Sequence, residues 1–378
     1  MTESYLNDQA GEPQDIRFMQ MALELAAQAT IATSPNPKVG CVIVKDGMVI
    51  GRGYTQPVGQ AHAEVQALRD AIATGHDTQG ATAYVTLEPC SHFGRTPPCA
   101  NALIDAGISR VVAAVQDPNP QVAGKGITML RDAGIVVESG LLGERTREMN
   151  IGFFKRMETG KPWVRMKVAA SLDGRTALAN GESKWITASD ARDDGHRWRA
   201  RADAILTGIG TVLADDPQMN VRAIETPRQP LKVVVDSKLR TPANAKLLQD
   251  GKSVIVCGEA IELKQGHQQN RQQVLIAQGA EVVCLPNDHH QVDLNALLLE
   301  LGRRQINELH VEAGAKLNGA LIAQDCVDEL LIYLAPKLLG DGAGLFDLPE
   351  LKLVADARQV RFHEISQVGE SLRILARF

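Results

Sequence analysis

The sequence predicts a two-domain protein in which both domains belong to the α/β class. The chain has 378 residues, which is longer than one hydrophobic core usually serves. Runs with strand composition alternate with runs of helical periodicity along most of it. This alternation stops in a charged segment that contains Gly and ends in Pro, residues 143–162, and then starts again. We therefore place the domain boundary near residue 149, which gives domains 1–149 and 150–378.

The first domain is expected to be a three-layer α/β/α sandwich. Residues 15–29 carry apolar side chains at helical spacing. Two strand-like runs follow within residues 39–54, and Asp46-Gly47 between them is a strong hairpin signal. After this hairpin, helices alternate with strands, an order that places helices on both faces of a sheet. The helices are expected at residues 62–73, 98–106 and 124–134, and the strands at 82–87, 110–115 and 135–139.

The second domain repeats the same alternation with shorter strands. A strand and loop are expected at residues 162–175, and a polar helix that leads into a strand at 190–208. Three short β runs, a strand–Gly turn–helix unit and a β-rich tail complete it, at residues 231–236, 253–258, 281–286, 306–324 and 328–378.

Composition and charge limit the classes of partner. The formal net charge is -5 at pH 7, so no basic field is present to attract a nucleic-acid backbone. The first fifteen residues are polar and acidic, unlike a signal peptide, and no apolar run approaches the roughly 18 residues of a membrane helix. We therefore expect a cytoplasmic protein with neither nucleic acid nor membrane as partner. Its cysteines are expected to be metal ligands or buried thiols rather than disulfides.

Two short stretches predict a zinc site. HAE at residues 62–64 opens a helical segment, EPC at 88–90 follows a strand, and Cys99 opens a helix directly after two prolines. Thiolates near helix N-termini have lowered pKa values and bind metal readily. His62, Cys90 and Cys99 give zinc three ligands and leave its fourth position for water, as in catalytic zinc sites. Glu64 is then placed to take a proton from that water and pass it to a leaving amine.

The cysteine spacing departs from the zinc-deaminase pattern H-x-E…P-C-x-x-C, because eight residues separate Cys90 from Cys99. His92, in the loop between them, is an alternative ligand. The His/Cys/Cys set already leaves the single open position that deaminase chemistry requires, so we favour that set.

The zinc arrangement resembles the cytidine-deaminase-like family. Four stretches of the first half resemble, more closely, the deaminase half of the bifunctional deaminase–reductases of riboflavin biosynthesis. They are SPNPKVGCVIVKDG, GQAHAEVQAL, YVTLEPCSHFGRTPPC and VVAAVQDPNPQVAGKG. That family carries the longer loop between its two cysteines.

The resemblance implies hydrolytic removal of the 2-amino group of a pyrimidine ribosyl phosphate, 2,5-diamino-6-(5-phosphoribosylamino)pyrimidin-4(3H)-one. It implies zinc on His62, Cys90 and Cys99, with proton transfer by Glu64. Asn36, His92 and Arg95 are expected to contact this substrate, and Arg95 suits its phosphate. Plain loop structure explains these last three residues equally well.

By its residues alone, the second half gives weaker signals. Gly208 and Gly210 match part of a dinucleotide fingerprint, but Leu213 stands where that fingerprint needs Gly. In VEAGAKLNGAL, Glu312 ends a strand and Gly314 turns the chain into a helix that begins near Leu317, a suitable place for a pyrophosphate. Many αβ units turn this way without a nucleotide, so both interpretations stay open.

Further stretches resemble the reductase half of the same family: MKVAASLDGRTA, GESKWIT, ILTGIGTVLADDPQMNVR, VVVDS, VEAGAKLNGAL and YLAPKLLG. The resemblance implies a dihydrofolate-reductase-like α/β fold and NADPH-dependent reduction of the ribosyl side chain, giving 5-amino-6-(5-phosphoribitylamino)uracil. By matched positions it implies NADPH contacts at Ala169, Trp185, Thr211, Asp215, Ser237, Gly314, Ala315, Lys316, Leu317, Asn318, Gly319 and Ala320. It implies substrate contacts at Ser183, Arg199, Met219, Arg222 and Glu312.

Several alternatives remain at this point. Asp215 is our candidate for proton transfer in the reductase, but it also suits a helix or turn cap. The choice of NADPH over NADH rests on the resemblance, because no arginine for a 2′-phosphate is identifiable. We also expect a homo-oligomer. The competing functions are a nucleic-acid base deaminase fused to an unrelated reductase, which the acidic charge opposes, and a zinc-stapled binding protein, which Glu64 beside an open zinc position opposes.

Overall fold

The structure, a computed structural model, describes residues 13–91, 98–120, 122–249, 253–258 and 267–378. The chain forms two compact units, the first ending at Thr159 and the second running from Gly160 to Phe378. The first unit thus extends ten residues beyond the expected boundary at 149. The charged segment forms two helices, α5 (Gly143–Met149) and α6 (Ile151–Thr159), and Phe153 and Phe154 of α6 are buried in the first unit's core.

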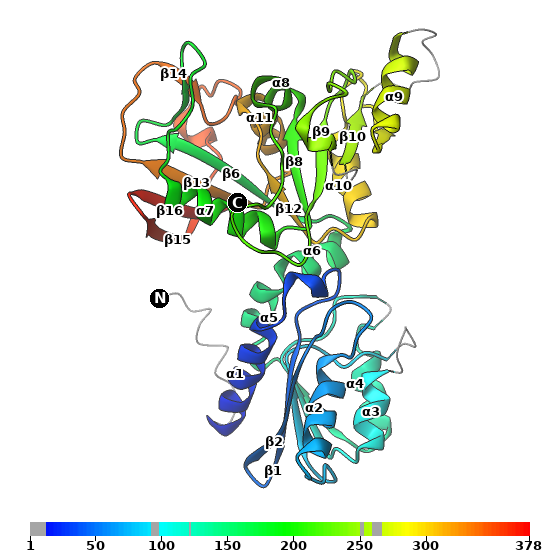
Figure 1. Cartoon of the computed structure of the whole chain (residues 1–378). Coiled ribbons are helices and arrows are strands. Elements are labelled where there is room, and N and C mark those ends of the chain that lie inside the picture. The colour runs from blue at the N-terminus through cyan, green and yellow to red at the C-terminus, as the bar shows by residue number, and fades with distance from the viewer. Residues whose placement is uncertain (1–12, 92–97, 121, 250–252, 259–266) are drawn as a thin grey trace. The chain divides into compact units, whose positions relative to one another are not determined.

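A five-stranded sheet forms the centre of the first unit (Figure 1). Its strands lie in the order β2-β1-β3-β4-β5. β1 is antiparallel to both of its neighbours, and β3, β4 and β5 are parallel. Asp46 and Gly47 have φ values of 51° and 75°, as the predicted hairpin turn requires. The strands are β1 (Gly40–Lys45), β2 (Met48–Tyr54), β3 (Thr82–Val85), β4 (Arg110–Ala113) and β5 (Val136–Ser139).

Helices cover both faces of this sheet, which confirms the predicted three layers. Cys41 and Ile43 of β1 enter the core on the side of α2, α3 and α4, whereas Val42 and Val44 enter the core on the side of α1. The helices are α1 (Pro13–Ala27), α2 (Ala63–Ala73), α3 (Cys99–Asp105) and α4 (Lys125–Asp132), with a 3-10 turn, η3 (Ile31–Thr33).

Two glycines let α2 lie unusually close to β2. A Cβ atom on Gly51 would lie 2.2 Å from the carbonyl oxygen of Ala67, and one on Gly53 would lie 2.2 Å from that of Ala63. Both separations are far below van der Waals contact, so no other residue fits at either position. The close approach fixes the first turn of α2, where the HAE stretch lies.

A nine-stranded sheet forms the second unit, in the order β11-β10-β9-β8-β12-β6-β13-β16-β15. The strands from β11 to β13 are parallel, whereas β16 and β15 add to the sheet in antiparallel fashion. β7 and β14 pair separately. The strands are β6 (Trp163–Ser171), β7 (Arg175–Leu178), β8 (Ala204–Gly208), β9 (Leu231–Val235), β10 (Ser253–Cys257), β11 (Ala280–Cys284), β12 (Glu308–Val311), β13 (Glu329–Ala335), β14 (Gly342–Gly344), β15 (Arg361–Val368) and β16 (Ser371–Arg377).

The helices of the second unit pack on both faces of its sheet. Leu297 of α10 and Leu321 of α11 lie in one core, and Ala191 of α7 packs on Tyr333 in another. The polar helix and the strand after it lie where predicted, but α11 begins two residues before Leu317. The helices are α7 (Ser189–Arg201), α8 (Ile209–Asp215), α9 (His267–Ala277), α10 (Leu294–Arg303) and α11 (Ala315–Ala323), with 3-10 turns η4 (Lys246–Leu248) and η6 (Val354–Asp356).

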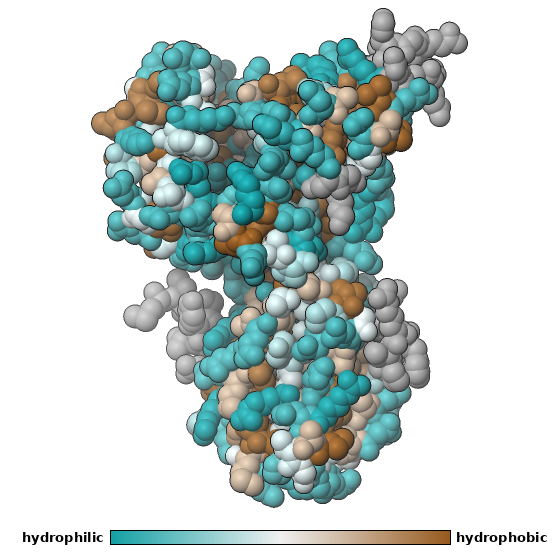
Figure 2. All heavy atoms as spheres, in the orientation of Figure 1, coloured by the Kyte–Doolittle hydropathy of each residue, from teal (hydrophilic) through white to brown (hydrophobic). Residues whose placement is uncertain are grey.

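The surface agrees with the composition. Figure 2 shows a mostly hydrophilic face on each unit, with hydrophobic side chains in separate patches. Among the helices within the described ranges, none has the length and apolar character needed to cross a bilayer.

Candidate active sites

The three predicted zinc ligands lie together in the first unit. Nδ1 of His62 is 3.3 Å from Sγ of Cys99 and 3.7 Å from Sγ of Cys90. One ligand atom from each residue lies within 4.8 Å of the other two. His62 is the N-cap of α2 and Cys99 is the first residue of α3, so two helix starts converge here. One imidazole nitrogen and two thiol sulfurs, from residues that are buried or half-buried, form a donor set that fits zinc.

The thiols of Cys90 and Cys99 have pKa values shifted in opposite directions. Hydrogen bonding to Cys99, helped by His62 and opposed by burial, lowers the pKa of Cys90 to about 4. The backbone N–H of Cys99 donates to the Cys90 sulfur at 3.3 Å. The hydrogen bond to Cys90 and burial raise the pKa of Cys99. One sulfur is therefore held as a thiolate, the form that binds metal.

Glu64 provides a proton-exchanging group beside the ligands. It lies in the first turn of α2 and is only 4% exposed. Burial, followed by the charge of Cys90, raises the pKa of Glu64 to about 7. A carboxyl with such a pKa can both accept and return a proton at neutral pH.

Glu88, which the sequence reasoning passed over, ties the Cys90 loop to the rest of the unit. It is 3% exposed, and each of its two carboxylate oxygens accepts two backbone N–H bonds at 2.9–3.1 Å. In the sequence, the signal that could have pointed to Glu88 is its position between an apolar strand and a proline. The donors lie after β4 and at the start of α4; they are Asp117, Gly124, Gly126 and Ile127.

Of the three predicted substrate contacts in the first unit, one lies within the described residues. Asn36 lies in the loop between η3 and β1, where its backbone N–H donates to the carbonyl of Thr33 at 2.9 Å. Its contact with substrate stays a prediction. His92 and Arg95 lie outside the described residues.

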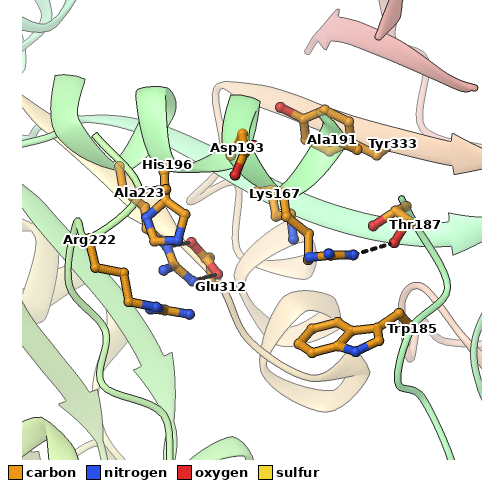
Figure 3. Close-up of a pocket in the computed structure, with 13 residues that line it drawn as sticks. Lys167, Trp185, Thr187, Ala191, Asp193, His196, Arg222, Ala223, Glu312 and Tyr333 are labelled. Carbon is orange, nitrogen blue, oxygen red and sulfur yellow. Dashed lines mark hydrogen bonds and ion pairs between the residues drawn. The ribbon is translucent and has the colours of Figure 1, made fainter. Parts of the chain in front are cut away.

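The second unit contains a cavity of about 350 Å³ between α7 and the sheet (Figure 3). Strands β6 and β13, the end of β12 and two loops complete its walls. It brings together four predicted residues, Trp185, Arg199, Arg222 and Glu312. The other lining residues are Lys167, Thr187, Ala191, Arg192, Asp193, Gly195, His196, Ala223 and Tyr333.

Arg199 and Glu312 form a bidentate ion pair. Nε and Nη2 of Arg199 lie 2.5 and 2.8 Å from the two carboxylate oxygens of Glu312, and Nε2 of His310 lies 3.2 Å from one of them. Burial opposes ionisation, but Arg199 outweighs it and holds the pKa of Glu312 well below its usual range. The sequence predicted that both residues contact substrate, but did not predict that they pair with each other.

Lys167 is a second residue that the sequence reasoning missed. It is a lone lysine in the apolar run of β6, half-buried, and it lines the cavity. Burial lowers the pKa of its ammonium group, although the carboxylate of Glu312 acts in the opposite direction. A lysine whose charge is costly in this way loses its proton more readily than one in water.

Trp185, a predicted NADPH contact, and the remaining predicted substrate residues, Ser183 and Met219, differ in position. Trp185 is 64% exposed, and the guanidinium of Arg192 lies over its ring at 4.6 Å from the centroid. Ser183 lies half-buried in the loop after β7. Met219 is 3% exposed and belongs to the core that also contains Val212, so the fold itself uses its side chain.

The predicted NADPH contacts gather at one edge of the sheet. Ala169 lies in β6, Thr211 follows β8, Ser237 follows β9, and residues 314–320 follow β12. These four strands are neighbours in the order β9-β8-β12-β6 and are parallel, so all four segments lie at their carboxyl ends. Open parallel sheets bind nucleotides at this edge.

Within this set, some side chains are already used by the fold. The side-chain amide of Asn318, 1% exposed, donates to the carbonyl of Ala313, and a Cβ on Gly319 would lie 1.9 Å from the carbonyl oxygen of Asp347. Asp215 is 43% exposed at its side chain and lies 3.7 Å from Nζ of Lys184. Asp215 is not among the residues that line the cavity, whereas Lys167 is.

The two sites together define a class of protein. One α/β unit carries a His/Cys/Cys group with a buried carboxyl, the donor set of a zinc deaminase. The other carries a charged cavity and a nucleotide-type sheet edge, as a pyridine-nucleotide reductase requires.

Comparison with known families matches both units. Residues 12–115 match the cytidine and deoxycytidylate deaminase zinc-binding region, and residues 162–374 match the RibD C-terminal domain. The riboflavin biosynthesis proteins RibD of Haemophilus influenzae and Escherichia coli are each 48% identical to the chain, over 96% and 94% of its length and 96% and 97% of theirs. The chain belongs to the RibD family and is a bifunctional deaminase and reductase of riboflavin biosynthesis that uses zinc and NADPH.

Solved structures agree over both units. Acinetobacter baumannii RibD, form 2, is 43% identical with a TM-score of 0.85, over 96% of this chain and 98% of that one. A Thermotoga maritima protein described as a diaminohydroxyphosphoribosylaminopyrimidine deaminase/5-amino-6-(5-phosphoribosylamino)uracil reductase is 31% identical with a TM-score of 0.83, over the same shares. The predicted fold, a cytidine-deaminase-like domain followed by an α/β reductase domain, is therefore confirmed.

Proposed function

We propose that the first unit hydrolytically deaminates 2,5-diamino-6-(5-phosphoribosylamino)pyrimidin-4(3H)-one. The second unit then reduces the ribosyl side chain of that product to give 5-amino-6-(5-phosphoribitylamino)uracil. The observation that carries this proposal is the presence in one chain of the His/Cys/Cys group with Glu64 and of the charged cavity around Lys167. The substrates in the description of the Thermotoga maritima protein support the same pair of reactions here.

In the deaminase, His62, Cys90 and Cys99 hold zinc, which when bound supplies a Lewis acid that makes water nucleophilic. Glu64 takes the proton that the attacking water gives up. It then delivers a proton to the departing amino group, so that ammonia leaves. The position of Glu64 supports both transfers, because it is buried in the first turn of α2, two residues after His62.

In the reductase, NADPH supplies a hydride to the ring-opened form of the ribosylamine. We assign the accompanying proton to Lys167 rather than to Asp215, because Lys167 lines the cavity and its pKa is lowered by burial. The paired Arg199 and Glu312 present fixed polar groups to the sugar hydroxyls, and Arg222 faces the phosphate.

Two variants test the assignment of proton transfer to Glu64 in the deaminase and to Lys167 in the reductase. Glu64→Gln should keep zinc but reduce ammonia release by about 10²–10⁴-fold, because the proton carrier is lost. The same variant should still oxidise NADPH when it is given the deaminated intermediate. Lys167→Met should do the reverse, releasing ammonia normally while NADPH oxidation falls by a similar factor. If Glu64→Gln deaminates at the wild-type rate with zinc bound, or Lys167→Met reduces normally, the corresponding assignment is wrong.

We infer that the protein is a homo-oligomer through strand β15, which ends the nine-stranded sheet. Phe362 and Ile365 of this strand are 69% and 56% exposed. An edge strand with exposed apolar side chains can pair with its own copy across a two-fold axis. A Phe362→Glu/Ile365→Glu variant should halve the mass measured by light scattering. Ile72→Glu, a control at a position that is also 69% exposed, should not.

We also propose a cytoplasmic location. No disulfide joins the cysteines in the described part of the chain, as expected in a reducing compartment. Fractionation of cells that produce the protein tests this.

A further inference from the structure

His196 lines the reductase cavity but has no part in the function proposed above. It belongs to α7, is 7% exposed, and its ring lies on the same side of the cavity as Arg222 and Glu312 (Figure 3). Its Nδ1 is fully enclosed and has no hydrogen-bond partner within the described residues. Nε2 is therefore the ring nitrogen that remains available to a ligand.

The groups that face this ring keep it uncharged. Burial, then the charges of Arg199 and Arg222, lower the pKa of His196 to about 4, while Glu312 and Asp193 act weakly in the other direction. At neutral pH the ring is a neutral imidazole with one N–H to donate. It adds a directional hydrogen bond to this side of the cavity without adding charge.

The neighbouring arginines differ in what they have left to offer. Arg199 is engaged by both oxygens of Glu312. Among the residues that the structure describes, Arg222 makes one side-chain hydrogen bond, a long one of 3.3 Å to Oδ1 of Asn220, so most of its five N–H donors have no partner there. A positive group with free donors next to a neutral N–H donor is suited to an oxyanion that accepts several hydrogen bonds.

The cavity has a second, chemically different side. In Figure 3, Trp185 and Thr187 lie across from His196 and Arg222, and Lys167 lies between the two sides. A flat aromatic surface and a central lysine suit the reacting end of a substrate. The side with His196 and Arg222 is left for the end that carries the phosphate monoester.

We propose that Nε2 of His196 donates a hydrogen bond to the substrate's phosphate beside Arg222, and that this contact makes the reductase prefer phosphorylated over dephosphorylated ribosyl substrates. The proposal rests on the reductase function proposed above. It adds a substrate-contacting residue and assigns it one specific atom.

Three substitutions at one position test the assignment. Gln places an amide nitrogen near the position of Nε2, Asn places one near Nδ1, and Leu places none. Each variant is assayed for NADPH oxidation with the deaminated substrate and with the same compound lacking its phosphate. Ammonia release by the deaminase and the zinc content serve as controls for folding.

For His196→Leu we expect the KM of the phosphorylated substrate to rise tenfold or more, because a hydrogen bond to a charged group is lost. The kcat and the KM of the dephosphorylated substrate should change less than threefold. His196→Gln should recover most of the loss and His196→Asn should not. Inorganic phosphate should inhibit wild type competitively, and its inhibition constant should weaken in His196→Leu by a similar factor.

Three results would overturn the proposal: an unchanged KM in His196→Leu, an equal rise for both substrates, or equal recovery by Asn and Gln. Failure of the underlying reductase function looks different. In that case wild type itself would oxidise no NADPH with either substrate.

Discussion

The zinc group and the reductase cavity are assembled in opposite ways. The zinc ligands come from one strand exit and two helix starts between residues 62 and 99. The walls of the cavity come from residues spread between Lys167 and Tyr333, on two strands, one helix, two loops and the segment that follows β12. In the first site, local turns place the side chains. In the second, the tertiary fold places them.

This difference decides how each site responds to change. A site made at helix starts depends on how a few helix ends and loops pack together and on the identity of its ligands. A site made between a helix and a sheet depends on ion pairs that join distant elements, such as Arg199 of α7 with Glu312 after β12. We therefore expect loss of a zinc ligand to abolish deamination outright, whereas substitutions in the paired charges of the second site should act through graded electrostatics.

The largest expected effect comes from removing a zinc ligand. Cys99→Ser should lower bound zinc from about one ion per chain to near zero and reduce ammonia release by at least about 10³-fold, because a serine hydroxyl is a much weaker ligand than a thiolate. NADPH oxidation with the deaminated substrate should stay within twofold of wild type. Metal analysis and the two separate assays measure this.

Cys326→Ser is the matched control, since Cys326 is also a buried free thiol but lies in the second unit. It should keep both zinc and deamination. If Cys99→Ser also retains zinc and turnover, the ligand set is wrong and the contrast between the two sites fails.

The ligand set was predictable because its signals are short. His62, Glu64, Cys90 and Cys99 lie in stretches whose turns and prolines already specify helix starts. Glu88 was missed because its importance lies in four backbone donors that come after β4 and from the start of α4. A glutamate in a sequence does not reveal which N–H groups it will meet.

In the second unit, the sequence predicted the elements better than the contacts. The strand–helix order and the Gly turn after β12 were readable, but the pairing of Arg199 with Glu312 brings together residues far apart in the chain. Lys167 looked like an ordinary lysine in a strand. The domain boundary was placed near residue 149, inside a charged segment, because a sequence does not show that Phe153 and Phe154 pack in the core of the first unit.

A second prediction concerns the ion pairs that Arg165 of β6 makes with two glutamates. Arg165 lies 2.8 Å from Glu308 and 2.5 Å from Glu329, and all three side chains are buried or nearly so. Although burial opposes ionisation, Arg201 and Arg165 lower the pKa of Glu308 to about 2. This carboxylate therefore stabilises the fold fully above its ordinary pKa of 4.5, and the stabilisation is lost as the pH falls from about 4.5 to about 2.

The expected loss is about 3 kcal/mol, the equivalent of this pKa shift. All three tryptophans of the chain lie in the second unit, so urea unfolding followed by tryptophan fluorescence between pH 5 and pH 2 measures it. Glu308→Gln should be less stable at neutral pH and should show a flatter dependence on pH. An unchanged pH slope in this variant would mean that other carboxylates dominate.

A third and smaller effect is expected at Glu88. Each carboxylate oxygen of Glu88 accepts two backbone N–H groups. In Glu88→Gln an NH2 group replaces one of these oxygens, so two backbone N–H donors would face another donor instead of an acceptor. We expect the first unit to lose about 1–3 kcal/mol of stability. Zinc release during urea unfolding reports on this unit, and tryptophan fluorescence should show the second unit unchanged. Equal stability of Glu88→Gln and wild type would show that this anchor contributes little.

The smallest effect is expected at Gly195, which lines the cavity in the middle of α7. A Cβ added there would meet no atom within 4 Å, so nothing in the protein requires a glycine at this position. Gly195→Ala should therefore stabilise the second unit by about 0.5–1 kcal/mol through helix propensity. The added methyl points into free cavity space, so the reductase KM should change less than threefold.

Gly302→Ala in α10 is the matched control: its Cβ would lie 1.8 Å from the carbonyl oxygen of Gly160, so the same substitution should destabilise. A tenfold rise in KM for Gly195→Ala would mean that substrate packs directly on the α7 backbone, and that this wall of the cavity is as tightly specified as the zinc group.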